Sequence, residues 1–164
     1  RLKKMTGDKP VLGLFWRSGL YISARKHFYP TIDLWGPILS LKNVAFLSLQ
    51  FDDDSHDLML AKQLFGVEIL KVEDINLRDD LDQTASLCKA LTGVIAPSTT
   101  TAHLSGSVGT KTIIMDRTTT WAPMINNNQD AVIPSIQRIF PPNVDDWKWN
   151  FAKARSVVKG WLRE

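Results

Sequence analysis

The sequence is poor in cysteine and histidine, which limits the kinds of site that it can build. Cys88 is the only cysteine among 164 residues, so no disulfide can form within the chain, and a reducing, cytoplasmic compartment is expected. The three histidines and Cys88 do not have the spacing of zinc ligands. We therefore expect no metal centre from these residues. Cys88 lies in an apolar helical pattern, and we expect it to be a core residue.

Other absences narrow the class of protein further. No apolar run approaches the roughly 18 residues that a membrane span needs. No Gly-x-Gly-x-x-Gly motif follows a candidate strand, which disfavours a dinucleotide-binding dehydrogenase. The net charge of +3 is small and the basic residues are dispersed, so nothing in the composition calls for nucleic acid. The sequence therefore predicts neither a membrane span nor a nucleic-acid partner.

The composition is that of a globular chain, with 44% hydrophobic and 23% charged residues. Its length suits a single domain over residues 1–164. The chain begins Arg-Leu-Lys-Lys, without an initiator methionine, and soon reaches an apolar segment. We therefore expect a domain cut from a longer protein.

Short apolar runs alternate with amphipathic segments along the chain, a pattern typical of alternating strands and helices. It predicts an α/β fold with three layers and a mostly parallel, Rossmann-like sheet. We expect strands over residues 11–16, 45–50, 67–70, 94–96 and 112–115, and an edge strand over 136–140. Helices are expected over residues 32–39, 57–65, 83–91, 102–109 and 145–162, and a long polar loop over 116–130. Thr31 is expected to cap the first helix and Gly66 to end the second.

The stretch GVIAPSTTTAHLSGSVG, residues 93–109, is the most informative part of the sequence. Four hydroxyl residues, 98–101, follow an apolar run that ends at Pro97, and His103 comes soon after. The first N–H groups of a helix lack partners inside the helix and carry partial positive charge. Together with hydroxyls and an imidazole they suit a phosphate group. On local sequence alone, simple capping of the helix is the more common explanation.

Polar residues follow three of the expected strands, and in parallel sheets ligands bind beyond these carboxyl ends. Arg17, Ser18 and Gly19 follow the first strand, where an arginine can form a fork on a phosphate and a glycine allows close approach. Gln50 and the aspartates 52–54 follow the second, and residues 98–103 follow the fourth. We expect the three segments to meet, which favours the phosphate interpretation.

Six blocks of the sequence resemble the C-terminal, donor-binding domain of two-domain glycosyltransferases of the GT-B architecture. The resemblance is greatest to bacterial glycosyltransferase domains attached to tetratricopeptide repeats, which are related to the lipopolysaccharide heptosyltransferases. The blocks are LGLFWRSG (12–19), YPTIDLWGPIL (29–39), FLSLQFDD (46–53), DLDQTASL (80–87), GVIAPSTTTAHLSGSVG (93–109) and IPSIQRIF (133–140).

This resemblance implies the second half of a GT-B fold that binds a nucleotide sugar, with no cofactor and no required metal. In the family, the segment that matches residues 98–103 usually reads Asp-(Ser/Thr)-x-x-x-His and holds the donor diphosphate; here Ser98 replaces the acid. The residues implied to bind the diphosphate are Arg17, Ser18, Gly19, Ser98, Thr99, Thr100, Thr101 and His103. Gln50, Asp52 and Asp54 are implied to lie toward the ribose and base, and the stretch before residues 80–87 to face the base.

The resemblance also implies that a saccharide or protein acceptor binds between this domain and an N-terminal domain that is missing here. The missing domain commonly supplies the catalytic base, so the catalytic residues stay unassigned, and the isolated chain is expected to bind donor weakly and transfer nothing. Two alternatives stay open. Asp52-Asp53-Asp54 contains the Asp-x-Asp pattern of metal-dependent glycosyltransferases, and Ser98 in place of the acid suits a non-catalytic nucleotide-binding or protein-interaction module.

Overall fold

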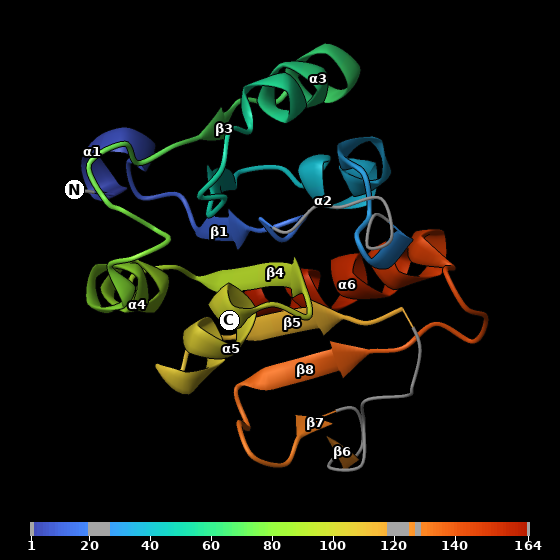
Figure 1. Cartoon of the computed structure of the whole chain (residues 1–164). Helices are drawn as coiled ribbons and strands as arrows, with labels where there is room; N and C mark the ends of the chain where they lie inside the picture. Colours follow the sequence, from blue (N-terminus) through green and yellow to red (C-terminus); the bar gives the residue numbers. More distant parts are fainter. Residues whose placement is uncertain (1, 20–26, 118–124, 127–128, 164) are drawn as a thin grey trace.

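Six parallel strands and two short antiparallel strands form one sheet in the computed structural model, which describes residues 2–19, 27–117, 125–126 and 129–163 (Figure 1). The order across the sheet is β3-β2-β1-β4-β5-β8-β7-β6. The strands are β1 (Val11–Leu14), β2 (Ala45–Ser48), β3 (Ile69–Leu70), β4 (Gly93–Pro97), β5 (Thr112–Met115), β6 (Ile125–Asn126), β7 (Gln129–Asp130) and β8 (Ile136–Ile139).

Helices cover both faces of this sheet, which confirms the predicted three-layer α/β, Rossmann-like fold. They are α1 (Leu2–Thr6), η2 (Ile32–Trp35), α2 (Gly36–Leu39), α3 (Ser55–Phe65), α4 (Leu81–Lys89), α5 (Thr100–Ser107) and α6 (Trp147–Trp161). One apolar core joins the sheet to η2, α2, α3 and α6, and a second joins it to α4 and α5. In Figure 1, α4 and α5 lie on one side of the sheet and α2 and α6 on the other.

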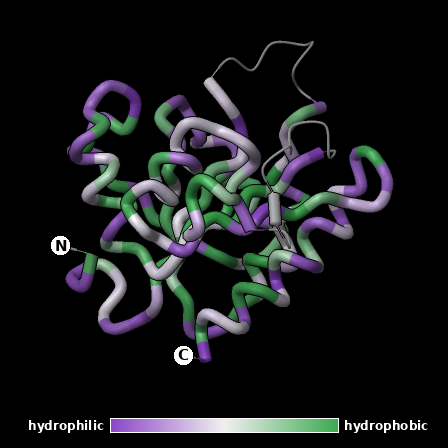
Figure 2. Tube along the Cα trace, turned by 90° about the horizontal axis from the view of Figure 1, so that it is seen from below, coloured by the Kyte–Doolittle hydropathy of each residue, from purple (hydrophilic) through white to green (hydrophobic). Residues whose placement is uncertain are grey.

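The central strands are apolar on both faces because helices cover both. On β1, Leu12 and Leu14 belong to the first core, whereas Val11 belongs to the second. In Figure 2 the hydrophobic segments pass through the centre of the molecule and the hydrophilic ones lie mostly at its periphery. The predicted core position of Cys88 is confirmed, since its side chain is fully buried, and burial raises the pKa of the thiol to about 11.

Several sequence predictions about individual elements hold. Gly66 ends α3 in the left-handed conformation, with φ of 65°. Along α6 the buried apolar positions recur at helical spacing, as predicted, at Trp147, Phe151, Ala154 and Val158. No helix among the described residues is long and apolar enough to cross a membrane.

Two predictions at the outer edge of the sheet are wrong. Residues 136–139 are not an edge strand, because β7 pairs antiparallel with β8 and β6 pairs antiparallel with β7. The predicted long loop over 116–130 therefore ends in strands; its residues 118–124 and 127–128 lie outside the described part of the chain. The segment INNNQD has no apolar alternation that would indicate strands. β6 and β7 pair through backbone hydrogen bonds, which leave no trace in the sequence.

The capping role predicted for Thr31 is also wrong. The segment starts as the 3-10 helix η2 and continues as α2, and the Thr31 side chain makes no capping hydrogen bond. Pro37 lies in the first turn of α2 and has no N–H to donate, which favours a break in the hydrogen-bond pattern between the two helices.

Candidate functional site

The strand order reverses between β1 and β4. β2 and β3 follow β1 toward one edge of the sheet, whereas β5 and β8 follow β4 toward the opposite edge. Leu14 of β1 is paired with Ile95 of β4, and the Phe15 N–H donates to the Ile95 carbonyl at 3.1 Å. The segments that follow β1 and β4 therefore leave the sheet side by side. Such a reversal is the usual ligand position in open α/β sheets.

The hydroxyl residues 98–101 surround the start of α5. Thr99 is its N-cap, with the side-chain oxygen accepting from the Ala102 N–H at 3.4 Å. Thr100 and Thr101 are already in the first turn of the helix, which begins two residues earlier than predicted, and Ser98 is exposed. Thr99 thus performs the capping role that the sequence left open. The first turn also presents partial positive charge and the exposed side chain of Thr100, which suit an anion, whereas Thr101 is buried.

His103 uses both of its ring nitrogens inside the protein. Its Nδ1 lies 2.8 Å from the Thr99 carbonyl oxygen, and its Nε2 lies 3.1 Å from Nη2 of Arg138. A carbonyl can only accept and a guanidinium can only donate, so the ring hydrogen sits on Nδ1 and Nε2 is the acceptor. In this arrangement His103 is a link between α5 and β8.

Arg138 is the centre of a buried charged cluster that sequence reasoning missed. Its Nη1 donates to Asp116 at 2.9 Å and its Nε to Asp130 at 3.0 Å, and it is only 9% exposed. Burial raises the pKa of Asp116 despite the opposing charge of Arg138. Burial also tends to raise the pKa of Asp130. Hydrogen bonds from the backbone of residues 132 and 133 and from Arg138 outweigh this effect, and the pKa of Asp130 is lowered. An arginine inside an apolar strand pattern is the one sequence signal that could have pointed to this cluster.

Arg17 is tied to the acidic segment that follows β2. Its Nε lies 3.2 Å from Asp52, its Nη1 forms an ion pair with Asp57, and its Nη2 donates to the Asp53 carbonyl at 2.6 Å. The indole N–H of Trp16 donates to the same carboxylate of Asp57 at 2.8 Å. The structure therefore brings two segments of the expected site together, through a guanidinium predicted to face the diphosphate and a carboxylate predicted to face the ribose.

Gln50 and Asp54 also have partners inside the protein. The Gln50 carbonyl oxygen accepts from the backbone N–H groups of Trp16 and Arg17 at 2.9 and 3.1 Å, and its amide donates to Asp52 at 2.8 Å. Buried Asp54 accepts from Ser48 at 2.6 Å and from Lys71 at 2.5 Å. These side chains hold the ends of β1, β2 and β3 in fixed relative positions.

Gly19 is packed against Phe51, and its predicted role in the close approach of a ligand stays a prediction. A Cβ atom at this position would lie 2.5 Å from the ring of Phe51, so a larger residue would displace that ring. Phe51 follows β2, and the guanidinium carbon of Arg78 lies 5.9 Å from its centroid. The loop after β1 is therefore packed directly against the segment after β2.

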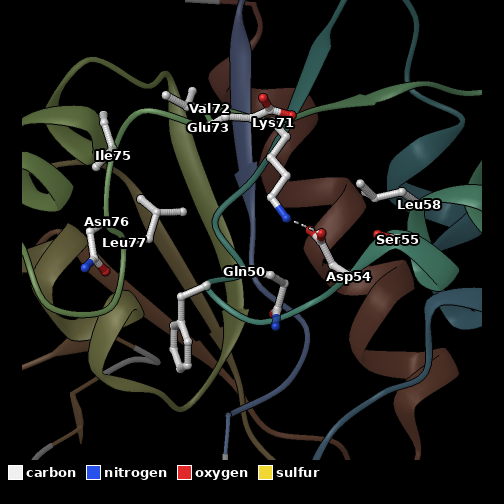
Figure 3. Close-up of a pocket in the computed structure, with 11 residues that line it drawn as sticks. Gln50, Asp54, Ser55, Leu58, Lys71, Val72, Glu73, Ile75, Asn76 and Leu77 are labelled. Atoms are coloured by element: carbon white, nitrogen blue, oxygen red, sulfur yellow. Dashed lines mark hydrogen bonds and ion pairs between the residues drawn. The ribbon is translucent and has the colours of Figure 1, made fainter.

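A pocket of about 540 Å³ opens beyond the carboxyl ends of β2 and β3 (Figure 3). In Figure 3, Lys71 and Asp54 point toward one another on one side, while Ile75, Asn76 and Leu77 form the opposite side. Among the described residues, two segments line the pocket, residues 50–58 and residues 71–77: Gln50, Phe51, Asp54, Ser55, Leu58, Lys71, Val72, Glu73, Ile75, Asn76 and Leu77. Both segments include residues that the sequence analysis placed toward a nucleotide base or ribose. Sequence reasoning missed Lys71.

The fold and this edge of the sheet define a Rossmann-like α/β domain with a pocket at the carboxyl ends of its parallel strands. No protein-family model matches the chain. It is similar to protein FlbA of Caulobacter vibrioides, with 36% identity over 159 residues. The aligned region covers 97% of this chain but only 26% of FlbA, so the chain spans about a quarter of the length of that relative.

Proposed function

We propose that this chain is the donor-binding half of a metal-independent glycosyltransferase of the GT-B architecture. The base and ribose of a nucleotide sugar occupy the pocket beyond β2 and β3, and the diphosphate lies at the start of α5. In this proposal the leaving diphosphate is stabilised by the N–H groups and hydroxyls of the first helical turn, where charge develops as the glycosidic bond breaks.

The observation that carries this proposal is the position of the pocket relative to the strand-order reversal. The pocket lies beyond β2 and β3, and α5 starts after β4; β2 and β4 are the two neighbours of β1. Two strand spacings, about 10 Å, therefore separate the end of β2 from the end of β4. The pocket has the mixed lining that favours a nucleoside, with apolar Ile75 and Leu77 facing the charged pair of Lys71 and Asp54.

The pairing of the aspartates after β2 supports chemistry that needs no metal. In the Asp-x-Asp pattern, Asp52 is held by Arg17 and Asp54 by Lys71. A divalent cation would have to compete with both of these positive charges. Manganese-dependent binding of the nucleotide would contradict this part of the proposal.

We propose further that the chain acts as part of a longer bacterial cytoplasmic protein, with an N-terminal domain and tetratricopeptide repeats, on a saccharide or protein acceptor. The similarity to about a quarter of FlbA supports the idea of a longer parent protein. In this proposal the catalytic residues lie on the missing N-terminal domain. The isolated chain therefore binds the donor but does not transfer its sugar.

A non-catalytic nucleotide-binding or protein-interaction module is the second candidate. It is favoured because positively charged side chains near the proposed site are already paired with carboxylates of the chain. Arg17, Lys71 and Arg138 all form ion pairs with carboxylates of the chain, and Ser98 stands where the related domains have an acid. Release of nucleotide from a nucleotide sugar by the longer protein, in the presence of acceptor, would exclude this candidate. Nucleotide binding without any release over hours would favour it.

The direct test is binding of UDP, GDP and ADP to the chain, measured by thermal shift and calorimetry. A ligand that binds only the folded state raises the melting temperature. Ile75→Trp should fill the pocket and abolish the shift, because Ile75 is a half-buried wall residue. Val132→Trp, at a side chain that is 68% exposed and is not part of the pocket, is the matched control and should keep it.

The phosphate position is tested separately by replacing Thr99 and Thr100 with valine. Valine keeps the shape of threonine but removes the hydroxyl, so the nucleotide-dependent shift should disappear while the nucleoside alone binds as before. A shift that survives in the double variant would place the phosphate elsewhere.

A further inference from the structure

We propose that Arg138 is a positioning residue of the nucleotide site, which acts through His103 on the first turn of α5. This inference rests on the proposed function, because it assigns a role in nucleotide binding. It differs from the sequence expectation in one respect: His103 contributes by fixing the geometry of the site and not by donating a hydrogen bond to the diphosphate.

A continuous chain of hydrogen bonds connects β8 to the N-cap of α5. Nη2 of Arg138 donates to Nε2 of His103 at 3.1 Å, and Nδ1 of His103 donates to the Thr99 carbonyl at 2.8 Å. The Thr99 side chain in turn accepts from the Ala102 N–H. The orientation of Thr99, whose neighbours carry the other hydroxyls, therefore depends on where Arg138 holds the imidazole ring.

Arg138 is itself held from two directions. Asp116, which follows β5, and Asp130 of β7 accept from two different nitrogens of the guanidinium, and the third nitrogen donates to His103. A buried ion pair adds little net stability compared with apolar packing, but it can specify one geometry. The planar fork of arginine can satisfy three partners at fixed angles, which a lysine cannot.

The other half of α5 is docked on the same strand by close packing. A Cβ atom on Gly106 would lie 2.3 Å from Cγ1 of Ile136, and Ser135 donates to the Gly106 carbonyl. These contacts fix the distance between the helix and β8 but involve only uncharged groups. The link from Arg138 to His103 is the charged contact at the end of the helix where the ligand is proposed to bind.

The surroundings of Arg138 argue for positioning and against direct contact with phosphate. Two carboxylates already neutralise the guanidinium, and the side chain is almost fully buried. His103 has no ring N–H left for an anion, because Nδ1–H faces the Thr99 carbonyl and Nε2 accepts from Arg138. Anion binding at this end of the site therefore falls to the N–H groups and hydroxyls of the first turn.

The test compares Arg138→Lys with Arg155→Gln in calorimetric titrations with UDP, GDP and ADP. Lysine keeps the charge but loses the fork, so we expect nucleotide affinity to fall about tenfold, the effect of losing one charged hydrogen bond. Arg155 on α6 donates to the Pro37 carbonyl on the opposite face of the sheet. Its variant loses a comparable hydrogen bond and should bind nucleotide as the unchanged chain does.

Two further measurements separate positioning from general stability. Nitrogen and carbon NMR shifts of the His103 ring should report the Nδ1–H form in the unchanged chain and a mixture of tautomers in Arg138→Lys, with no nucleotide present. In a double-mutant cycle, Arg138→Lys should have no additional effect on affinity once His103 is alanine.

Each outcome has a distinct meaning. If the unchanged chain binds none of the three nucleotides, the proposed function fails, and the role of Arg138 in it fails too. If the unchanged chain binds nucleotide and Arg138→Lys binds it equally well, the positioning role alone is overturned. Additive effects of the His103 and Arg138 variants would also overturn it, because Arg138 would then not act through His103.

Discussion

The two halves of the proposed site are built in opposite ways. On the side of β2 and β3 the sheet ends in an open pocket of about 540 Å³, whose Lys71 side chain is 34% exposed. On the side of β5 and β8 it ends in a closed cluster, in which the side chain of Arg138 is 10% exposed and its two carboxylates are little more so. The open half can recognise a ligand by shape, whereas the closed half can only fix the groups around it. The comparison teaches that a charged residue beside the proposed site can have all its partners inside the protein.

The largest expected effect is on the closed half. Arg138→Leu would leave Asp116 and Asp130 buried without their cation, and breaking a buried ion pair from one side costs about 3–5 kcal/mol. Arg17→Leu, in the more open cluster around Asp52 and Asp57, should cost about 1 kcal/mol of unfolding free energy. Urea denaturation of both variants measures the contrast. Equal losses would show that the two clusters are equivalent in energy.

The contact between α5 and β8 gives the next largest effect. Gly106→Ala forces a methyl group against Ile136 and should destabilise the chain by about 1–3 kcal/mol, the usual cost of overpacking a core. Gly160→Ala in α6 is the control, because a Cβ there has nothing within 4 Å. It should stabilise the chain by about 0.5–1 kcal/mol, the helix preference of alanine over glycine. Thermal unfolding of the two variants should therefore shift in opposite directions.

The smallest effect depends on pH and again belongs to the closed half. The folded state lowers the pKa of Asp130, so its stabilising contribution is present above the ordinary aspartate pKa of about 4 and is lost as the pH falls through the lowered value. Asp130→Asn should therefore cost about 1–2 kcal/mol at pH 7 and progressively less below pH 4. Denaturant titrations at pH 7 and pH 3 test this. A cost that stays constant with pH would mean that the charge of Asp130 does not contribute.

The hydrophobic pattern was sufficient to predict most of the fold because it reports burial directly. The strand over residues 112–115 was predicted to the residue, and the buried face of the last helix was found from its spacing. The errors fall where structure depends on backbone hydrogen bonds. The hairpin of β6 and β7 has no apolar alternation, and α5 begins inside a run of hydroxyl residues that also suit a cap.

The candidate site could be predicted only in part. The sequence pointed to the segments after β1, β2 and β4, because polar residues follow apolar runs there. It did not reveal that Lys71 lines the pocket or that Arg138 contacts His103. Their partners are far away in the chain: Arg138 and His103 are separated by 35 positions, and Lys71 and Asp54 by 17.

The sequence by itself determined the α/β layers, the two buried faces of the sheet and the hydroxyl-rich start of α5, because these follow from local periodicity and capping chemistry. Only the tertiary structure decided which charge faces which. Strand order and register place Arg138 of β8 beside α5, and they bring Arg17 to the acidic segment after β2. Electrostatic pairing acts over a few ångströms in space, so it depends on which strands become neighbours and not on distance along the chain.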